Sequence, residues 1–301
     1  MVHIPQQVRA FSGELAGLAV LDVGCGDMVA DMGLLTLGVK HIHGLDVVPD
    51  WNPIDAAAQQ VKKAGFAPAA DYVSRLSYRA YDGVHFPFPD NHFDFVFSWS
   101  AFEHIPDVPA ALDEIRRVVK PLGQVFLQVY PWFHTSPGSH LSDYIQEPFF
   151  HLRRSPEWVY ERLKEYAANH PEASGFVLNH MWPEYGRLNG YSARKFLNAI
   201  MEAGFCIDKV ETVINEESIQ DAPADVPIAD LLTIGTKVLL RPGKPFNQEQ
   251  LANAQLQKQI VTVQSALEAE RAKLKSIEQS KSWQMTEPIR AFMQAARDLF
   301  K

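Results

Sequence analysis

A stretch rich in aromatic residues and proline, residues 131–190, holds several side chains that can move a proton. The candidates are His134, His140, Asp143 and His151, and His104 lies earlier in the chain. Histidine is the usual base near neutral pH, so such residues could remove the proton of a substrate hydroxyl. His140 stands in a short Gly-Ser loop, where it could act as the base, contact a substrate, or make only a structural hydrogen bond.

The same side chains offer nitrogen and oxygen atoms to a metal ion. The possible ligands are His134, His140 and Asp143, but their spacing fits no standard metal site. Isolated His and Asp residues in loops are usually not ligands, so we expect no metal. For His180, which follows Leu178-Asn179, we expect packing or contact with carbohydrate.

A second group of residues has the spacing of a nucleoside-binding site. The segment 22–27, DVGCGD, follows an apolar run and precedes a helical pattern. Its glycines let the backbone turn tightly and approach a ligand, and Asp46 ends the next strand, where a carboxylate can accept both ribose hydroxyls. A structural tight turn would explain the glycines equally well. NAD stays possible, although Met28 or Val29 stands where that fingerprint has its third glycine.

Residues 18–130 resemble the class I S-adenosylmethionine-dependent methyltransferases, because further segments of that family occur in order. Residues 82–95, DGVHFPFPDNHFDF, resemble the family's stretch of acidic residue, spacer, Leu-Pro-Phe, Pro-Asp and Phe-Asp. Residues 98–105, SWSAFEHI, look like its segment beside the methionine end of the cofactor and the acceptor. Residues 112–128 match the helix–Pro–Gly–strand that follows.

The resemblance implies S-adenosyl-L-methionine as the cofactor and places Asp82 beside its adenine amino group. It also makes His104, near the methyl end, a candidate comparable to His140. The cofactor-binding residues that we expect are Asp22, Gly24, Cys25, Gly26, Asp46, Val47, Asp82, Gly83 and Ser98.

The elements that must position these residues alternate along the chain. Strands are expected at 18–23, 41–46, 78–81, 93–98 and 124–130, and helices at 29–37, 54–64, 110–119 and 192–203, with a terminal strand pair at 206–213 and 231–240. Alternation of this kind predicts an α/β fold with a parallel sheet and right-handed crossovers. The resemblance makes it a Rossmann-like class I methyltransferase sheet with helices on both faces. Residues 131–190 interrupt the pattern and are expected to form a partly helical insertion over the ligand face.

The composition changes after residue 245, which we take as the end of the methyltransferase domain, 1–245. Residues 246–281 place apolar side chains on alternating three- and four-residue steps, a coiled-coil pattern that predicts a homo-oligomer. A single helix packed on the domain is the alternative. Residues 282–301 predict an amphipathic helix, suited to an anionic membrane interface, to a groove in a partner, or to folding back on the domain.

Two segments resemble parts of methyltransferases encoded among bacterial cell-surface polysaccharide genes. Residues 137–152 carry a Gly-x-His-Leu and a Pro-aromatic-x-His-Leu pattern, and residues 280–290 a Ser-x-Ser-Trp motif ending in Pro-Ile-Arg. This resemblance implies an O-methyltransferase acting on a sugar hydroxyl of an O-antigen or lipopolysaccharide precursor, with polysaccharide-assembly enzymes as partners. The expected catalytic residues are His140, His104 and Asp143, and the expected substrate contacts are His134, His151 and His180. A small-metabolite methyltransferase and a non-catalytic, cofactor-binding adaptor remain open.

The bulk composition limits the partners and the compartment. A formal net charge of −8 disfavours nucleic acid, which needs clustered Lys and Arg. Only Cys25 and Cys206 occur, without metal or disulfide spacing, which suits a reducing cytoplasm. Neither a signal-peptide pattern nor an apolar run of membrane-spanning length is visible. We therefore expect a cytoplasmic protein, with peripheral contact to the inner face of the cell membrane at most.

Overall fold

The computed structural model describes residues 3–49, 53–67, 69, 71–215 and 219–243, all within the first of two units of the chain, Met1–Pro245. The expected coiled coil at 246–281 and terminal helix at 282–301 lie outside the described residues. Within the described part, no helix combines the length and the apolarity needed to cross a bilayer.

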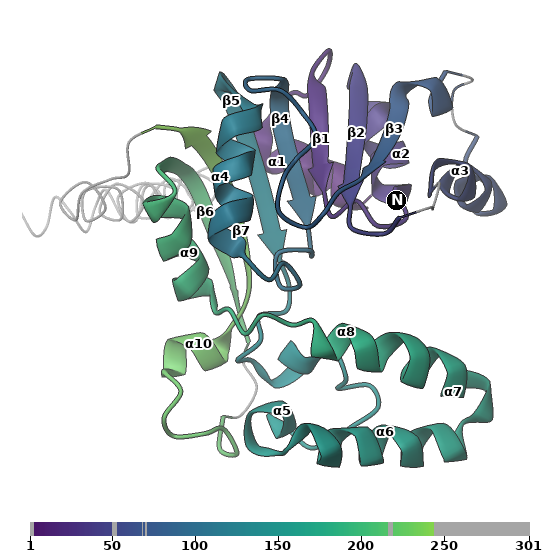
Figure 1. Cartoon of the computed structure of the whole chain (residues 1–301), viewed down its shortest axis with the longest axis vertical. Coiled ribbons are helices and arrows are strands. Elements are labelled where there is room, and N and C mark those ends of the chain that lie inside the picture. Colours follow the sequence, from purple (N-terminus) through teal and green to yellow (C-terminus); the bar gives the residue numbers. More distant parts are fainter. Residues whose placement is uncertain (1–2, 50–52, 68, 70, 216–218, 244–301) are drawn as a thin grey trace, which may run out of the picture. The chain divides into compact units, whose positions relative to one another are not determined.

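Seven strands form one sheet in the order β3-β2-β1-β4-β5-β7-β6 (Figure 1). They are β1 (Ala19–Val23), β2 (His41–Asp46), β3 (Leu76–Ala80), β4 (Phe93–Trp99), β5 (Val119–Val129), β6 (Phe205–Ile214) and β7 (Thr233–Pro242). The first five are parallel, and β7 runs antiparallel to both β5 and β6. The strand order reverses between β1 and β4, and the carboxyl ends flanking such a reversal are where open α/β sheets bind ligands.

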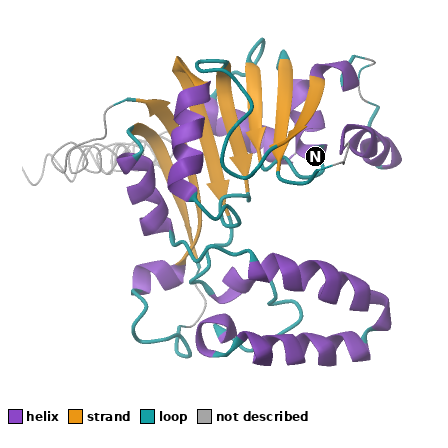
Figure 2. Ribbon diagram, viewed as in Figure 1, coloured by secondary structure: helices purple, strands orange, loops and turns teal. Residues whose placement is uncertain are grey.

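Helices cover both faces of the sheet, as predicted (Figure 2). One face carries α4 (Val108–Val118) and α9 (Ala193–Glu202), and the other carries α1 (His3–Ser12), α2 (Val29–Leu34) and α3 (Pro53–Lys63). In β1 the side chains alternate between these layers: Leu21 and Val23 enter the core under α4 and α9, and Val20 enters the core on the other face.

The predicted insertion between β5 and α9 is mostly helical and has its own core. Its elements are η3 (Ser136–Ser139), α5 (Phe150–Arg153), α6 (Pro156–Asn169), α7 (Pro171–Phe176), the π-helix η4 (Val177–Met181) and α8 (Trp182–Gly186). The buried residues of this core are Leu141, Ile145, Phe150, Val159, Leu163 and Val177. At its start Trp132 is fully buried, and its Nε1 donates to Thr236 Oγ1 of β7 at 2.9 Å. Figure 1 shows the insertion on the side toward which β1, β4 and β5 point.

Three local expectations differ from the structure. The helix α1 was not predicted. Residues 231 and 232, expected in the last strand, end α10 (Ile228–Leu232), because the Pro227 carbonyl accepts from Asp230 N and Leu231 N and starts a helical turn. Pro121 and Gly123 were expected to separate α4 from β5. They lie instead inside β5, which begins at Val119 and has an irregular register opposite Phe93 and Phe95.

Candidate active site

The glycine loop after β1 is held against its neighbours on one side and open on the other. Gly24 (φ +76°) donates its N–H to Leu45 O at 2.8 Å, and an added Cβ there would come within 2.3 Å of Ala101 Cβ. Gly26 (φ +50°) is different: apart from its two chain neighbours, no heavy atom of the described residues lies within 4 Å of the place where its Cβ would be. Both positive φ values favour glycine, and the open side leaves room for a ligand to approach the backbone.

Asp46, at the end of β2, is fixed by backbone amides of two loops. Its Oδ2 accepts from Gly26 N at 3.0 Å, and its Oδ1 accepts from Val47 N at 2.7 Å. The structure therefore brings together the predicted residues Gly26, Asp46 and Val47. A carboxylate accepts more than two hydrogen bonds, so Asp46 can still take bonds from ribose hydroxyls.

The loop after β3 places Asp82 and Gly83 next to the loop after β2. The Asp82 carboxylate accepts from Val84 N and His85 N at 2.8 and 2.7 Å and lies 3.0 Å from the His85 ring. These hydrogen bonds, that with the His85 ring first, hold the pKa of the Asp82 carboxyl well below its usual range. Gly83 (φ +87°) has Val47 Cγ1 3.8 Å from where a Cβ would be, so the two loops adjoin.

The rest of the β3–β4 loop is anchored to helix α4. Phe86 and Phe88 are buried in the core, and their carbonyls accept hydrogen bonds from the Arg117 guanidinium at 3.0 and 2.8 Å. The Glu114 carboxylate accepts from Phe86 N at 2.7 Å. This anchoring explains why the aromatic part of the family-like segment 82–95 serves packing, and only its first residues reach the ligand side.

Two buried acids lie beneath the glycine loop. Asp22, at the end of β1, is 3% exposed, and Asp31 of α2 is fully buried. The two carboxyl groups lie close enough for a hydrogen bond between them when one is protonated. Burial raises the pKa of Asp22 above its ordinary value, and the charges of Asp31 and Asp46 add to this. Burial likewise raises the pKa of Asp31 to about 7.

Asp31 was missed in the sequence, although a signal existed. It stands in a predicted helix next to the apolar Met32 and Leu34, both fully buried, where an unpaired acid is out of place. Its position beside Asp22 gives the cofactor region a second buried acidic group.

Two residues expected to contact the cofactor have buried side chains in the structure. The Ser98 side chain is fully buried and donates to Val23 O at 2.7 Å, so it joins β4 to β1 and has no surface for a ligand. The Cys25 side chain packs toward Gly44 and Met28 in the core below the loop. Burial raises the pKa of the Cys25 thiol, so only its backbone can serve a ligand.

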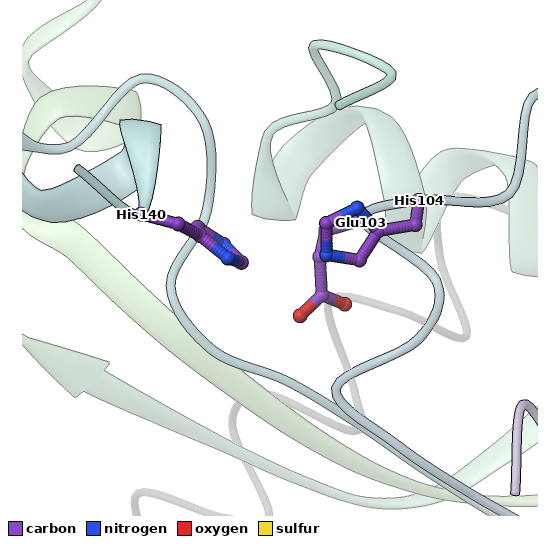
Figure 3. A group of neighbouring side chains, drawn as sticks. All are labelled: Glu103, His104 and His140. Carbon is purple, nitrogen blue, oxygen red and sulfur yellow. The ribbon is translucent and has the colours of Figure 1, made fainter. Parts of the chain in front are cut away.

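On the acceptor side, Glu103, His104 and His140 form one cluster (Figure 3). Each contributes an atom able to bind a metal, and these atoms all lie within 4.8 Å of one another. Glu103 and His104 follow β4, and His140 follows η3 with a left-handed backbone (φ +60°). The two rings meet edge to face with centroids 5.2 Å apart. The structure thus joins the two predicted histidines and adds Glu103, which was missed although it directly precedes His104.

Burial dominates the electrostatics of this cluster. Glu103 is 2% exposed, and burial raises its pKa to about 8. Burial lowers the pKa of His104 to about 4, with a smaller contribution from Arg187. Burial also lowers the pKa of His140 to about 4, with His104 as the next cause. Near neutral pH both imidazoles are therefore uncharged, with lone pairs available to a ligand.

Asn189, at the end of the insertion, fixes the segment that carries Glu103 and His104. Its Nδ2 donates to Phe102 O at 2.6 Å and to Ile105 O at 2.8 Å. Its backbone N donates to Glu103 O at 2.9 Å. Three hydrogen bonds from one residue therefore hold this turn, a positioning role that no local pattern in the sequence indicated.

The remaining predicted site residues are placed differently. His151 is buried and bonds Phe133 O through Nε2 at 2.6 Å, and its pKa, lowered to about 4 by burial, is influenced by His134 and His140. His151 and His134 therefore lie near the cluster. Asp143 is exposed and is not part of the cluster, and His180 is exposed and stacks on Phe176 with centroids 5.0 Å apart.

A surface cavity of about 430 Å³ lies on the insertion, away from the cluster residues. It is bounded by residues 144–147 and by α6, and aromatic side chains share its lining with polar ones. It contains none of the predicted site residues. Trp132, Phe149 and Phe150, by contrast, are at most 1% exposed, so they belong to the core and offer no face to a sugar.

Comparison with known proteins shows that part of the region just described matches a protein family. Residues 21–127 match the family model of a methyltransferase domain. A sterol 24-C-methyltransferase of Gibberella zeae is 35% identical over 120 residues, which cover 40% of this chain and 29% of the relative. A demethylmenaquinone methyltransferase of Bacillus subtilis is 34% identical over 111 residues, covering 36% of this chain and 44% of the relative. The chain thus spans less than half the length of these relatives.

Among solved structures, an S-adenosylmethionine-dependent methyltransferase from Mesorhizobium loti is similar with a TM-score of 0.48 and 18% identity. The similarity covers 78% of this chain and 96% of that one. The family model and the curated relatives support a class I methyltransferase domain over residues 21–127, with S-adenosylmethionine as its cofactor.

Proposed function

We propose that the protein transfers the methyl group of S-adenosylmethionine to a sugar hydroxyl of a cell-surface polysaccharide of the O-antigen type, or of its precursor. One observation carries the choice of site. The segment holding Glu103 and His104 begins at Ala101, which packs against Gly24 of the cofactor loop. The acceptor cluster therefore starts where the cofactor site ends.

The transfer is an in-line displacement that needs close positioning and no covalent enzyme intermediate. The acceptor oxygen forms a bond to the methyl carbon while the carbon–sulfur bond breaks. The electron pair of the broken bond stays on sulfur, which changes from a sulfonium to a neutral thioether. The hydroxyl must also give up its proton, and we assign the activation of that hydroxyl to the cluster of Glu103, His104 and His140.

The cofactor side supplies acidic groups. S-Adenosylmethionine carries a positive sulfonium and a positive ammonium group, and the region under the glycine loop holds Asp22, Asp31 and Asp46. Asp22 interacts electrostatically with both of the others. We assign Asp46 to the ribose hydroxyls and Asp82 to the adenine end.

The insertion also carries a cavity, separate from the acceptor cluster, that suits a further sugar unit of a glycan acceptor. The cavity of about 430 Å³ is lined by Tyr144, Trp158 and Tyr166 together with polar side chains such as Arg162 and Asn169. Flat aromatic faces flanked by hydrogen-bonding groups match the apolar and hydroxylated sides of a sugar ring. The resemblance of residues 137–152 to polysaccharide-locus enzymes supports the same class of acceptor.

The test is methyl transfer from cofactor labelled in its methyl group. We expect label in a lipid-linked glycan extracted from a polysaccharide-producing bacterium, and none in the pool of small metabolites. Label in a small metabolite alone would favour the small-metabolite methyltransferase. Cofactor binding without transfer to either fraction would favour the non-catalytic adaptor. Mass spectrometry of the surface polysaccharide with and without the protein then identifies the sugar.

For residues 246–281 and 282–301 we propose self-association and contact with a membrane surface or a partner enzyme. Deleting Ser282–Lys301 should leave transfer to a water-soluble acceptor unchanged and shift the protein out of the membrane fraction. If the shortened protein fractionates as the full-length chain does, the terminal segment does not direct its location.

A further inference from the structure

The acceptor cluster (Glu103, His104 and His140) contains more buried polar atoms without a hydrogen-bond partner than a protein core normally has. Within the described residues, both carboxylate oxygens of Glu103, Nδ1 of His104 and Nε2 of His140 are buried without a hydrogen-bond partner. Burying a polar group without a partner costs free energy, and burying a carboxylate costs more. One ligand could satisfy the Glu103 oxygens and His140 Nε2 together, which indicates a binding site. His104 Nδ1 faces Glu184 Oε2 at 3.7 Å and leaves the other ring nitrogen for that ligand.

The donor types point to a cation. Two imidazole nitrogens and one carboxylate oxygen form a ligand set that suits zinc and related divalent transition metals. Three protein ligands leave a fourth coordination position open, as in catalytic zinc sites. We propose that Glu103, His104 and His140 bind one divalent transition-metal ion of the zinc type.

The spacing of the three donors is compatible with such an ion. Their atoms lie within 4.8 Å of one another. Donors at 2.0–2.2 Å from a tetrahedral zinc ion are roughly 3.4 Å apart, so modest side-chain rotations bring them into the ligand positions. Figure 3 shows the Glu103 carboxylate and the two rings turned toward a common space.

The surroundings of both histidines also fit ligands of a metal. The Pro131 backbone interacts with the His140 ring. Nε2 of that ring is buried without a partner among the described residues, so it is the nitrogen left for the cluster. Metal-binding histidines commonly donate their second nitrogen to a backbone carbonyl or a carboxylate. Beside His104, Glu184 Oε2 lies 3.7 Å from Nδ1, close enough to orient the ring.

An ion in this position would explain how the cluster activates the acceptor, a role that rests on the proposed function, whereas the binding itself does not. The acceptor hydroxyl would occupy the open position, and the positive charge would lower the pKa of that hydroxyl. Its proton leaves to solvent water, the oxygen attacks the methyl carbon, and the electron pair of the carbon–sulfur bond stays on sulfur. The metal remains divalent throughout.

The experiment uses the full chain after treatment with a chelator, titrated with Zn²⁺ by calorimetry and with Co²⁺ by visible absorption. We expect one ion per chain and a Co²⁺ spectrum typical of a site with four or five ligands. Glu103→Gln and His140→Ala should each weaken binding at least about tenfold. The matched control is His3→Ala, an exposed histidine of α1, which should bind as the unaltered chain does. Thermal unfolding and S-adenosylmethionine affinity show whether each variant is folded.

Two results would overturn the proposal: a folded, unaltered chain that binds neither ion stoichiometrically, or binding that persists in both folded variants. The labelled-methyl assay separates this inference from the proposed function. Methyl transfer by a metal-free protein would contradict the role of the metal and support the methyltransferase activity. Stoichiometric metal binding without transfer to any acceptor would support the metal site and contradict the proposed function.

Discussion

The cofactor region and the acceptor region treat their polar groups in opposite ways. On the cofactor side, Asp46 and Asp82 each accept two backbone N–H bonds, so their carboxylates are fixed before a ligand arrives. On the acceptor side, Glu103, His104 and His140 hold buried atoms that lack partners within the described chain, and burial favours their uncharged forms. A site whose carboxylates are already fixed by hydrogen bonds suits a cofactor of constant shape. A site whose buried polar atoms lack hydrogen-bond partners suits a ligand that supplies those partners when it binds.

The two regions also differ in how the fold assembles them. Asp22, Asp46 and Asp82 each end or follow a parallel strand, so the sheet brings them to one edge. The acceptor cluster joins the turn after β4 to His140 in the insertion, with Asn189 from a third segment holding that turn. Damage to one region should therefore leave the other working.

The largest effect is expected from His140→Ala. It removes one member of the acceptor cluster, and losing a group that activates the acceptor typically costs roughly 10²- to 10⁴-fold in rate. Turnover in the labelled-methyl assay should fall by that amount, while calorimetry gives an unchanged affinity for S-adenosylmethionine. Equal turnover in a folded variant would remove His140 from the acceptor site.

The converse change, Asp46→Ala, should act on the cofactor alone. Losing a charge-assisted hydrogen bond costs about 1.5–3 kcal/mol, or roughly tenfold to over a hundredfold in affinity. Calorimetry should show weaker S-adenosylmethionine binding, with a fold intact by circular dichroism and with metal binding at the cluster preserved. An unchanged affinity for the cofactor would contradict the assignment to the ribose.

Asn189→Ala should loosen the acceptor turn without touching the cofactor loops. The carbonyls of Phe102 and Ile105 lose their donor, which costs on the order of 1–3 kcal/mol of stability. We expect the maximal rate to fall about tenfold because small misplacements near reacting atoms are costly, with cofactor affinity unchanged. A variant that loses stability yet keeps its full rate when folded would show that Asn189 only supports the fold.

The smallest effect concerns the pH dependence of the cofactor-free protein. The folded pKa of Asp31, raised to about 7 by burial, exceeds an unfolded value of about 3.9. The folded state therefore binds more protons between these values, so the contribution of Asp31 to stability is present at low pH and is lost as pH rises toward 7.

Replacing Asp31 by Asn should remove this loss and make the slope of the unfolding free energy against pH, measured between pH 4 and 7, more positive. The same variant should bind the cationic cofactor more weakly, since one nearby acid is gone. Parallel stability curves for the two proteins would mean that Asp31 is not protonated by folding.

The sequence by itself determined the α/β fold and most of the cofactor region. Strand and helix periods, together with glycines at 24 and 26, are local signals, and a residue that follows a parallel strand is carried to the ligand edge by the sheet. For that reason Gly26, Asp46, Val47, Asp82 and Gly83 lie together in the structure, and their role in cofactor binding stays a prediction. The side chains of Ser98 and Cys25 are buried instead, because a side chain's direction at a strand end depends on what packs around it.

Only the tertiary structure decided the acceptor region. Glu103, His140 and Asn189 are far apart in the chain, and their approach depends on how the insertion folds around its own core. No spacing in the sequence shows which of several histidines lose water and partners together, so Asp143 and His180 were as eligible as Glu103. Burial and the loss of hydrogen-bond partners depend on how the whole molecule packs. They distinguish Glu103, His104 and His140 from the other polar residues of the chain.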